Sequence, residues 1–364
     1  MENRRSFVKK LAIGAVTLPI GAIATSQLIT TEKKLNIALV GLGRYADYLA
    51  KGIAVSKHCK LAGIVTGTPA KIPVWRAKYD IPLANCYNYQ NFDKIVENGG
   101  IDVIYIVLPN GLHKEYAIRA ANAKKHVIVE KPMAVTAQEC LEMIAACERN
   151  KVQLAVGYRL HFEPYNMEMM RLGQEEVFGK VKLVQASLGY RVNDADPTDW
   201  HFSKKLSGGG PLQNLGVYCV QAARYITGEE PVAVTAQFGP VTNKAVYKEV
   251  EESIHWQMKF PGGAVATCTS SNSYSIDRLY AAAERGTFEL SPAISYGPFV
   301  GKSSNGPMDF PTTNQQQVQM DEMAKFILNG KPFPDHISGV EGLKDLKVID
   351  AIYKAASSGK SELI

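Results

Sequence analysis

The stretch LNIALVGLGRYA, residues 35–46, decides the fold. Its first six residues are mostly apolar and predict a buried strand, whereas residues 47–55 have helical character. Gly41, Gly43 and Ala46 form the pattern Gly-x-Gly-x-x-Ala in the strand–turn–helix setting of a dinucleotide-binding unit. Gly41 permits the tight turn, Gly43 lets the backbone approach a pyrophosphate, and Ala46 allows close helix–strand packing. The free N–H groups at the start of the helix would then bind the phosphates.

Strands and helices alternate from this unit onward. The sequence predicts further strands at residues 60–65, 102–108, 126–130 and 152–157, and helices at 92–97, 113–123 and 136–150. The last helix opens with a capping box formed by Thr136 and Glu139. Strands and helices at this spacing predict an α/β domain with a parallel, doubly wound sheet.

The end of the second predicted strand indicates which nicotinamide nucleotide binds. A protein selective for NAD usually places a carboxylate there to hold the ribose 2′-hydroxyl. Thr66 and the two residues after it provide none, and Arg44 and Lys71 can supply positive charge. We therefore favour NADP over NAD and expect Arg44, Tyr45, Thr66 and Lys71 to line the cofactor site. The alternative for Lys71 is an ordinary surface lysine.

A charged pair ends the buried strand at residues 126–130. Glu130 and Lys131 follow three apolar residues and precede Pro132. Lysine is rarely buried without a partner, so Lys131 is either a solvated strand end or a functional residue. Because ligands bind at the carboxyl ends of parallel strands, we expect it beside the nicotinamide. Further residues predicted at this edge of the sheet are Glu130, Leu108, Pro109, Asn110 and His113. For His113, a surface position at a helix start is equally open.

The second half has a different pattern. It predicts long strands at residues 181–192, 231–238, 253–260, 264–271 and 278–290, with few helices until 315–329 and 340–357. The predicted fold is an α+β domain with a large, mostly antiparallel open sheet. We assign residues 1–30 to a signal peptide and short linker, 31–157 to the nucleotide-binding domain, and 158–340 to a substrate and oligomerisation domain. Residues 341–364 form a helix expected to pack back on the first domain.

One helix of this half begins unusually, with three glycines at residues 208–210. Asn214 and Tyr218 are four residues apart, so both project from one helix face. A glycine-rich entry leaves backbone open to a ligand, which makes both residues candidates for the active site. The alternative is a flexible loop followed by an amphipathic helix that partly buries Tyr218.

Composition and the N-terminus limit the partners. The first 24 residues carry four of the 41 basic and one of the 35 acidic residues, so the remaining chain has a net charge of +3. That charge is too small to indicate nucleic-acid binding. Arg4 and Arg5 precede a short apolar run and an Ala-Ile-Ala cleavage site, which is typical of a twin-arginine signal. We expect an exported, periplasmic protein without stable membrane association after cleavage; an uncleaved anchor is the alternative. The six cysteines show no metal-site spacing, and no metal is predicted.

The motifs together resemble a known family. The Gly-x-Gly-x-x-Ala start, Glu130-Lys131-Pro132, Gly157-Tyr158-Arg159 and the glycine-rich helix up to Tyr218 are similar in order and spacing to the Gfo/Idh/MocA oxidoreductases. Within the family, the resemblance is greatest to the glucose–fructose oxidoreductases. It implies a Rossmann domain plus a β-sheet domain that often forms homodimers or homotetramers through its open face. It also implies that Lys131 lies in the active site and that Tyr218 is the acid/base residue.

Two departures from the family pattern stand out. The family usually has aspartate where this chain has Asn214, and asparagine can orient a sugar hydroxyl but cannot take its proton. The sugar-disproportionating relatives also carry a long arm that covers the cofactor, and here only residues 25–34 are available. Arg159, His161 and Trp200 lie in stretches expected to contact the sugar; Tyr274 and Tyr296 are weaker candidates.

The resemblance implies hydride transfer between C1 of an aldose and tightly bound NADP, with a second sugar restoring the cofactor. Tyr218 would act as the base, and a Lys131 ammonium beside it would favour the phenolate. Two alternatives remain: a redox-assisted glycosidase of the same fold that uses bound NAD, and a non-catalytic ligand-binding protein.

Overall fold

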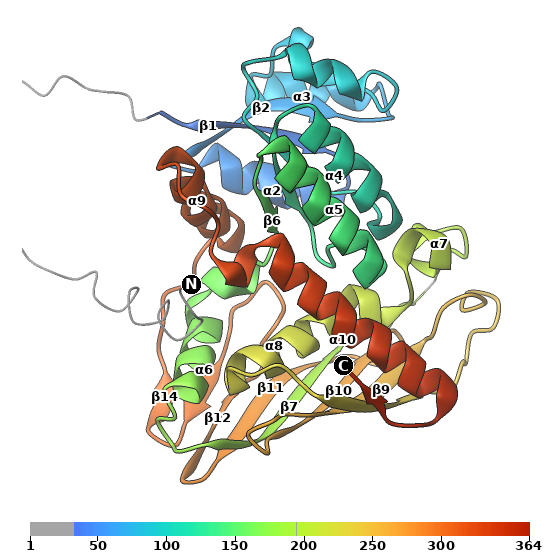
Figure 1. Cartoon of the computed structure of the whole chain (residues 1–364), viewed down its shortest axis with the longest axis vertical. Helices are drawn as coiled ribbons and strands as arrows, with labels where there is room; N and C mark the ends of the chain where they lie inside the picture. The colour runs from blue at the N-terminus through green and yellow to red at the C-terminus, as the bar shows by residue number, and fades with distance from the viewer. Residues whose placement is uncertain (1–32, 194) are drawn as a thin grey trace, which may run out of the picture.

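The computed structural model describes residues 33–193 and 195–364. The signal peptide predicted for residues 1–30 lies outside them. The upper lobe in Figure 1 contains a six-stranded sheet in the order β3-β2-β1-β4-β5-β6, with every neighbouring pair parallel. Its strands are β1 (Leu35–Val40), β2 (Cys59–Val65), β3 (Cys86–Tyr87), β4 (Val103–Ile106), β5 (His126–Val129) and β6 (Leu154–Val156). This order is that of a doubly wound Rossmann sheet, as predicted.

Both faces of this sheet are buried, because alternate residues of each strand enter different cores. In β1, Ile37 and Leu39 pack towards one core, and Ala38 and Val40 towards the other. The flanking helices are α2 (Arg44–Ala54), α3 (Lys71–Tyr79), α4 (His113–Asn122) and α5 (Ala137–Asn150), with short 3₁₀ turns η1 (Leu83–Asn85), η2 (Phe92–Glu97) and η3 (Asn110–Leu112). Thr136 caps α5 by accepting a hydrogen bond of 3.2 Å from the Glu139 N–H, as the capping box predicts.

The lower lobe contains a nine-stranded sheet in the order β14-β13-β12-β11-β7-β10-β9-β8-β15. Its strands are β7 (Val181–Gly189), β8 (Ala233–Phe238), β9 (Ser253–Lys259), β10 (Val265–Ser271), β11 (Ile276–Ala283), β12 (Gly286–Leu290), β13 (Gly301–Ser303), β14 (Gly306–Met308) and β15 (Glu362–Leu363). All neighbours are antiparallel except β7 and β10, which are parallel. The predicted large, mostly antiparallel sheet is therefore confirmed.

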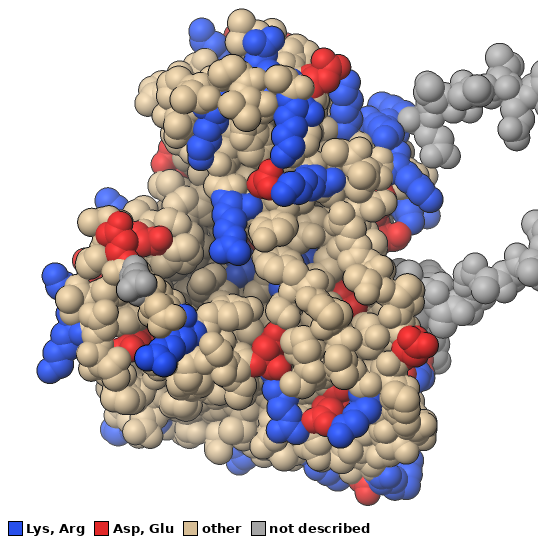
Figure 2. Space-filling model, turned by 180° about the vertical axis from the view of Figure 1, so that it is seen from behind, with Lys and Arg blue, Asp and Glu red and all other residues tan. Residues whose placement is uncertain are grey.

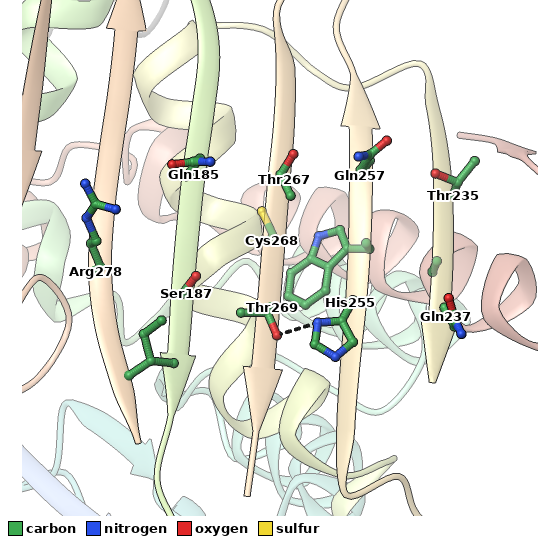
Figure 3. Close-up of a pocket in the computed structure, with 13 residues that line it drawn as sticks. Gln185, Ser187, Thr235, Gln237, His255, Gln257, Thr267, Cys268, Thr269 and Arg278 are labelled. Atoms are coloured by element: carbon green, nitrogen blue, oxygen red, sulfur yellow. Dashed lines mark hydrogen bonds between the residues drawn. The ribbon is translucent and has the colours of Figure 1, made fainter. Parts of the chain in front are cut away.

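Helices cover one face of this sheet and leave the other open. In the described chain, α6 (Pro164–Gln174), α8 (Val217–Thr227) and α10 (Gly339–Ser358) lie on the side towards the upper lobe (Figure 1). The opposite face is hollowed and presents amide and hydroxyl side chains of β7 to β10, together with Arg278 of β11 (Figure 3). The remaining helical turns are η4 (Arg159–Phe162), η5 (Trp200–Phe202), α7 (Lys204–Ser207), η6 (Leu212–Gly216) and η7 (Asp335–Ile337).

Two local predictions are wrong. Residues 278–290 are a hairpin, not one strand: β11 and β12 pair antiparallel across a turn at Glu284 and Arg285. The turn requires Gly286, because a Cβ there would lie 2.7 Å from the Phe178 ring. The second departure is α6, a helix in a stretch where none was predicted. Pro164 begins it, and the Glu163 carboxylate caps it by accepting from the Tyr165 and Asn166 N–H groups.

The C-terminal helices join the two lobes. α9 (Gln315–Leu328), in the range assigned to the second domain, packs on α2 of the upper lobe. α10 packs on α5 and also on β8 and α8, so it contacts both lobes. Within residues 33–193 and 195–364, no helix is long and apolar enough to cross a membrane.

Candidate active site

The glycine loop has the shape of a dinucleotide-binding turn. Gly41 has a φ of +88°, and a Cβ there would lie 2.5 Å from the Val107 carbonyl oxygen, so only glycine fits. At Gly43 an added Cβ would meet nothing within 4 Å, which leaves the backbone open to a ligand. Gly43 precedes α2 without capping it through a side chain, so the first N–H groups of the helix remain for phosphate oxygens. Ala46 is fully buried, as close helix–strand packing requires. The loop therefore fits the pyrophosphate of a nicotinamide dinucleotide.

The surroundings of this loop are basic. Lys71 donates a hydrogen bond of 2.8 Å from Nζ to the Leu42 carbonyl, which holds it against the loop. Arg44, the first residue of α2, is exposed, and Thr66 is buried with its hydroxyl accepting from the Thr68 N–H. Figure 2 shows Lys and Arg side chains gathered on the upper lobe and around the hollow beneath it. This charge, with no carboxylate at the end of β2, fits a ribose 2′-phosphate.

The loop after β4 is fixed to its neighbours through Asn110 and His113. Asn110 is buried and donates from Nδ2 to the Ser207 carbonyl oxygen at 2.7 Å, which ties the loop to the lower lobe. The ring of His113 is fully buried, with Nε2 2.8 Å from the Leu108 carbonyl and Nδ1 3.0 Å from the Pro132 carbonyl. Burial lowers the pKa of His113 to about 4, so the ring is neutral at pH 7.

These contacts correct the prediction for His113. The surface position is wrong because the side chain is fully buried. The ring also leaves neither nitrogen to a cofactor, since both face backbone carbonyls. Because a neutral imidazole carries one N–H, the ring donates to one of these two carbonyls and packs against the loop that carries the other.

The Glu130 side chain turns into the protein. Its Oε1 accepts a hydrogen bond of 2.6 Å from the Tyr105 hydroxyl, which in turn accepts one of 2.7 Å from Gln319 Nε2. Burial raises the pKa of Glu130 to about 7. Gly157 makes the arrangement possible, because a Cβ there would lie 2.5 Å from both Glu130 Oε1 and the Tyr105 hydroxyl oxygen. Glu130 thus supports the strand end that carries Lys131.

Lys131 and Tyr218 come together across the two lobes. Lys131 Nζ donates a hydrogen bond of 2.7 Å to the Asn214 carbonyl oxygen and lies 4.7 Å from the centroid of the Tyr218 ring. Asn214 is in the π-helical turn η6, and Tyr218 is in the first turn of α8. Single π-helical turns recur at functional sites because they re-aim side chains. Both side chains are partly exposed while their neighbours at 215–217 are buried, so they share the open helix face as predicted.

Arg159 joins Lys131, Asn214 and Tyr218 in one cluster, which we call the Tyr218 cluster. Its guanidinium carbon is 5.2 Å from the Tyr218 centroid and 4.6 Å from the Tyr296 centroid. Tyr296 in turn stacks on Tyr48 of α2, with centroids 5.1 Å apart and planes 11° apart. Tyr45 belongs to the same region, because its ring centroid lies 6.4 Å from that of Tyr48 and its hydroxyl is buried without a hydrogen-bond partner among the described residues.

Two predicted sugar contacts are not part of the cluster. His161 is buried, its Nδ1 lies 3.0 Å from the His336 carbonyl, and its ring packs between Tyr158 and Tyr225. It follows Arg159 by two residues in the 3₁₀ turn η4, so the two side chains point in different directions. Trp200 stacks on His201 in η5, with centroids 3.8 Å apart.

Tyr48, Tyr105 and the glutamines at the start of α9 are further residues of this region that no sequence motif indicates. Tyr48 follows Tyr45 by three residues, so helical spacing was the available signal. Among the described residues, no group of three or more His, Cys, Asp or Glu side chains is arranged to hold a metal.

The nucleotide loop and the lysine–tyrosine pair at its sheet edge define an oxidoreductase that uses a nicotinamide dinucleotide. Residues 35–158 match the model of an oxidoreductase family with an NAD-binding Rossmann fold, and residues 167–289 match the GFO/IDH/MocA C-terminal domain. The chain therefore belongs to the Gfo/Idh/MocA family.

Individual relatives agree with this assignment. The chain is 38% identical to an aldose-aldose oxidoreductase from Caulobacter crescentus whose crystal structure contains glycerol; the match covers 91% of this chain and 100% of that one, with a TM-score of 0.88. It is 25% identical to D-xylose 1-dehydrogenase [NADP(+)] of Haloarcula marismortui, covering 90% of this chain and 92% of the relative. It is 24% identical to inositol 2-dehydrogenase of Rhizobium meliloti, covering 89% and 97%.

Proposed function

We propose that this protein transfers hydride between C1 of an aldose and a tightly held NADP, and that a second sugar restores the cofactor. The main support for this proposal is the position of the Lys131 ammonium, 4.7 Å from the centre of the Tyr218 ring at the carboxyl edge of the Rossmann sheet. The similarity of the chain to the aldose-aldose oxidoreductase and to the NADP-dependent xylose dehydrogenase supports a sugar hydroxyl as the reacting group. NADP supplies the hydride acceptor and donor.

The chain's own residues supply the proton transfer. In the oxidative direction, the Tyr218 phenolate takes the proton of the C1 hydroxyl; in the reductive direction, the phenol returns it. Lys131 stabilises negative charge on the phenolate and on the sugar oxygen, because its ammonium is held in place by the Asn214 carbonyl. The side-chain amide of Asn214 has no hydrogen-bond partner among the described residues and can bind a sugar hydroxyl.

Asn214 cannot accept a proton, as the aspartate usual in the family could. Its backbone carbonyl, however, still anchors Lys131. Lys131 is anchored by the carbonyl oxygen of residue 214 and not by its side chain. Replacing aspartate with asparagine therefore leaves the lysine anchor intact. The reaction then depends on Tyr218, and not on a carboxylate at this position, for its proton acceptor.

Export would explain why a second sugar restores the cofactor. Arg4 and Arg5 before the apolar run favour the twin-arginine route, which carries folded proteins. Little free nicotinamide nucleotide exists outside the cytoplasm, so an exported dehydrogenase has to keep its cofactor and regenerate it in place. Changing Arg4 and Arg5 to lysine should leave the protein in the cytoplasmic fraction, whereas changing Lys9 and Lys10 to arginine should not.

The reaction is tested on protein purified without added nucleotide. Glucose should generate the near-ultraviolet absorbance of reduced nicotinamide, and a second sugar, tried from a panel of aldoses and ketoses, should abolish it. Aldonate and the reduced sugar should appear in equal amounts. The absence of any bound, reducible nicotinamide contradicts the proposal. Release of a sugar from a glycoside without aldonate identifies a glycosidase, and no reaction with any sugar pair identifies a binding protein.

A further inference from the structure

A loop of the lower lobe reaches the helix that carries the nucleotide loop. Residues 291–300 join β12 to β13, and Tyr296 within them stacks on Tyr48 of α2. The centroids are 5.1 Å apart and the planes nearly parallel, at 11°. Tyr48 lies one helical turn after Arg44, so it shares a face of α2 with the exposed arginine beside the glycine loop. The stack is therefore a contact between the lobes next to the dinucleotide-binding turn.

Asp277 of β11 fixes the backbone of this loop through hydrogen bonds. Its carboxylate accepts three hydrogen bonds from consecutive backbone N–H groups, those of Ala293 at 2.9 Å, Ile294 at 2.8 Å and Ser295 at 2.9 Å. Ala293 and Ile294 are also almost completely buried. Tyr296 comes directly after this fixed segment, so the backbone that presents its ring is ordered by the lower lobe itself.

Arg159 holds the same segment from the side of the active site. Its guanidinium donates to the carbonyl oxygens of Ile294 and Ser295 and to Gln315 Oε1. The guanidinium carbon also lies 4.6 Å from the Tyr296 centroid. The Tyr296 ring therefore has both a cation and the Tyr48 ring as neighbours, and a cation beside an aromatic ring is stabilising.

Tyr296 is 48% exposed despite these contacts. A fold that needed this ring only for its core would bury it. Its stack on Tyr48 crosses from the lower lobe to α2, which indicates a role in holding the two lobes together. The carboxyl edge of a doubly wound sheet, where dinucleotides bind, faces the lower lobe at Lys131 and Asn110 as well.

We propose that Tyr48 and Tyr296 form a clasp that slows the release of the bound dinucleotide. This inference rests on the proposed function, since it assumes the nicotinamide cofactor of that reaction. In this proposal a bound dinucleotide leaves when the lobes part at this point, and parting them separates the two rings. Arg159 and Asp277 keep Tyr296 in position, so the contact re-forms without reordering the loop.

The test measures exchange of bound NADP with an excess of radiolabelled NADP, together with nucleotide content after gel filtration. Tyr48→Ala and Tyr296→Ala should each exchange about 3- to 10-fold faster than the wild type, the range expected for one aromatic pair. The double variant should exchange no faster than the faster single variant, because both substitutions remove the same contact. Tyr296→Phe keeps the ring and should exchange like the wild type.

Tyr274→Ala is the matched control. Tyr274 is an exposed tyrosine of the same lobe, but its hydroxyl bonds to Thr269 on the open sheet face, away from α2. It should exchange at the wild-type rate. A wild type that holds NADP but exchanges it as fast as the two alanine variants overturns the clasp and leaves the sugar chemistry standing. Rate increases that multiply in the double variant also overturn it. A wild type that binds no nicotinamide nucleotide overturns the clasp and the proposed function together.

Discussion

The Lys131 ammonium and the Tyr218 ring are 4.7 Å apart, although their residues are 87 positions apart in the chain and belong to different lobes. The lysine is held there by a hydrogen bond of 2.7 Å to the Asn214 carbonyl, one helical turn before the tyrosine. The positive charge is therefore fixed relative to the phenol before any substrate binds. Such preorganisation is the property that lets a charge stabilise a transition state at little reorganisation cost.

Lys131→Ala should lower kcat/KM about 100-fold or more and change the free energy of unfolding by only about 1 kcal/mol. The lysine makes one hydrogen bond to a carbonyl and is partly exposed, so its loss costs the fold little. Lys125→Ala is the matched control, because Lys125 also donates to a backbone carbonyl, that of Asn98 at 2.7 Å, but away from the site. Steady-state kinetics and denaturant unfolding of both variants check this. Equal activity losses would contradict a catalytic role for Lys131.

Tyr218→Phe should lower activity by about 10²- to 10⁴-fold, the usual contribution of a general acid–base. The phenyl ring preserves the contacts with Lys131 and Arg159, so bound nucleotide and stability should stay close to the wild type. Tyr225→Phe removes a hydroxyl from the same helix, where it donates to the His336 carbonyl and to Glu341. That control should lose stability and keep its activity. Full activity in Tyr218→Phe would assign the proton transfer to another group.

Glu130 should make stability fall as the pH rises. Burial raises the pKa of Glu130 from its ordinary value of 4.5 to about 7, so between these values the folded state binds a proton that the unfolded state has lost. The contribution of Glu130 to stability is therefore greatest below about pH 4.5 and is lost as the pH rises through 7. The shift corresponds to about 3 kcal/mol.

Glu130→Gln tests this pH dependence, because it is neutral at every pH and can still accept the hydrogen bond from Tyr105. Relative to the wild type, it should gain stability at pH 8 and gain little at pH 4.5. Denaturant unfolding at both values, with NADP present at saturation, measures the difference. Wild-type and variant curves that stay parallel between these pH values would contradict the titration of Glu130.

The sequence predicts the Rossmann sheet well because its signals are local. The glycine pattern, the apolar strands and the capping residue Thr136 each act within a few positions, and the structure confirms them. The contacts of individual side chains are not predicted in the same way. Arg159 and His161 look equivalent in sequence, but a 3₁₀ turn sends one to the Tyr218 cluster and the other to His336.

Tertiary contacts also decide the second lobe. Gly286 is the one local signal of a hairpin within residues 278–290, and its packing against Phe178 can be seen only in the fold. Likewise, Tyr48 and Tyr296 meet because Asp277 and Arg159 hold the loop of residues 291–300, which carries Tyr296. Such contacts between residues far apart in sequence leave no periodicity to detect.

Arg224→Met should destabilise the fold by about 3–5 kcal/mol. The Arg224 guanidinium is fully buried and pairs with Glu341 at 2.8 Å, with Asp345 and with Glu230 at 2.7 Å. The variant therefore removes the cation that two buried carboxylates share, although Glu341 keeps a longer contact of 3.8 Å with Lys344. The pair joins α8 to α10. Arg171→Met is the control: Arg171 also pairs with two carboxylates, but it is partly exposed on α6, so its loss should cost less than about 1 kcal/mol. Similar losses in the two variants would contradict the buried network.

The open sheet face should carry the contact between copies of the chain. Its side chains form cross-strand rows of amides and hydroxyls, and one row consists of Gln185, Thr267, Gln257 and Thr235 (Figure 3). Gln257→Lys puts a charge at the centre of this row, and in a two-fold interface each copy would add its own, so the charges would repel. Sedimentation velocity should then detect a homodimer or homotetramer in the wild type and a smaller species in the variant. Gln138→Lys, exposed on α5, should sediment like the wild type. A monomeric wild type, or a Gln257→Lys variant that assembles normally, would contradict assembly through the sheet face.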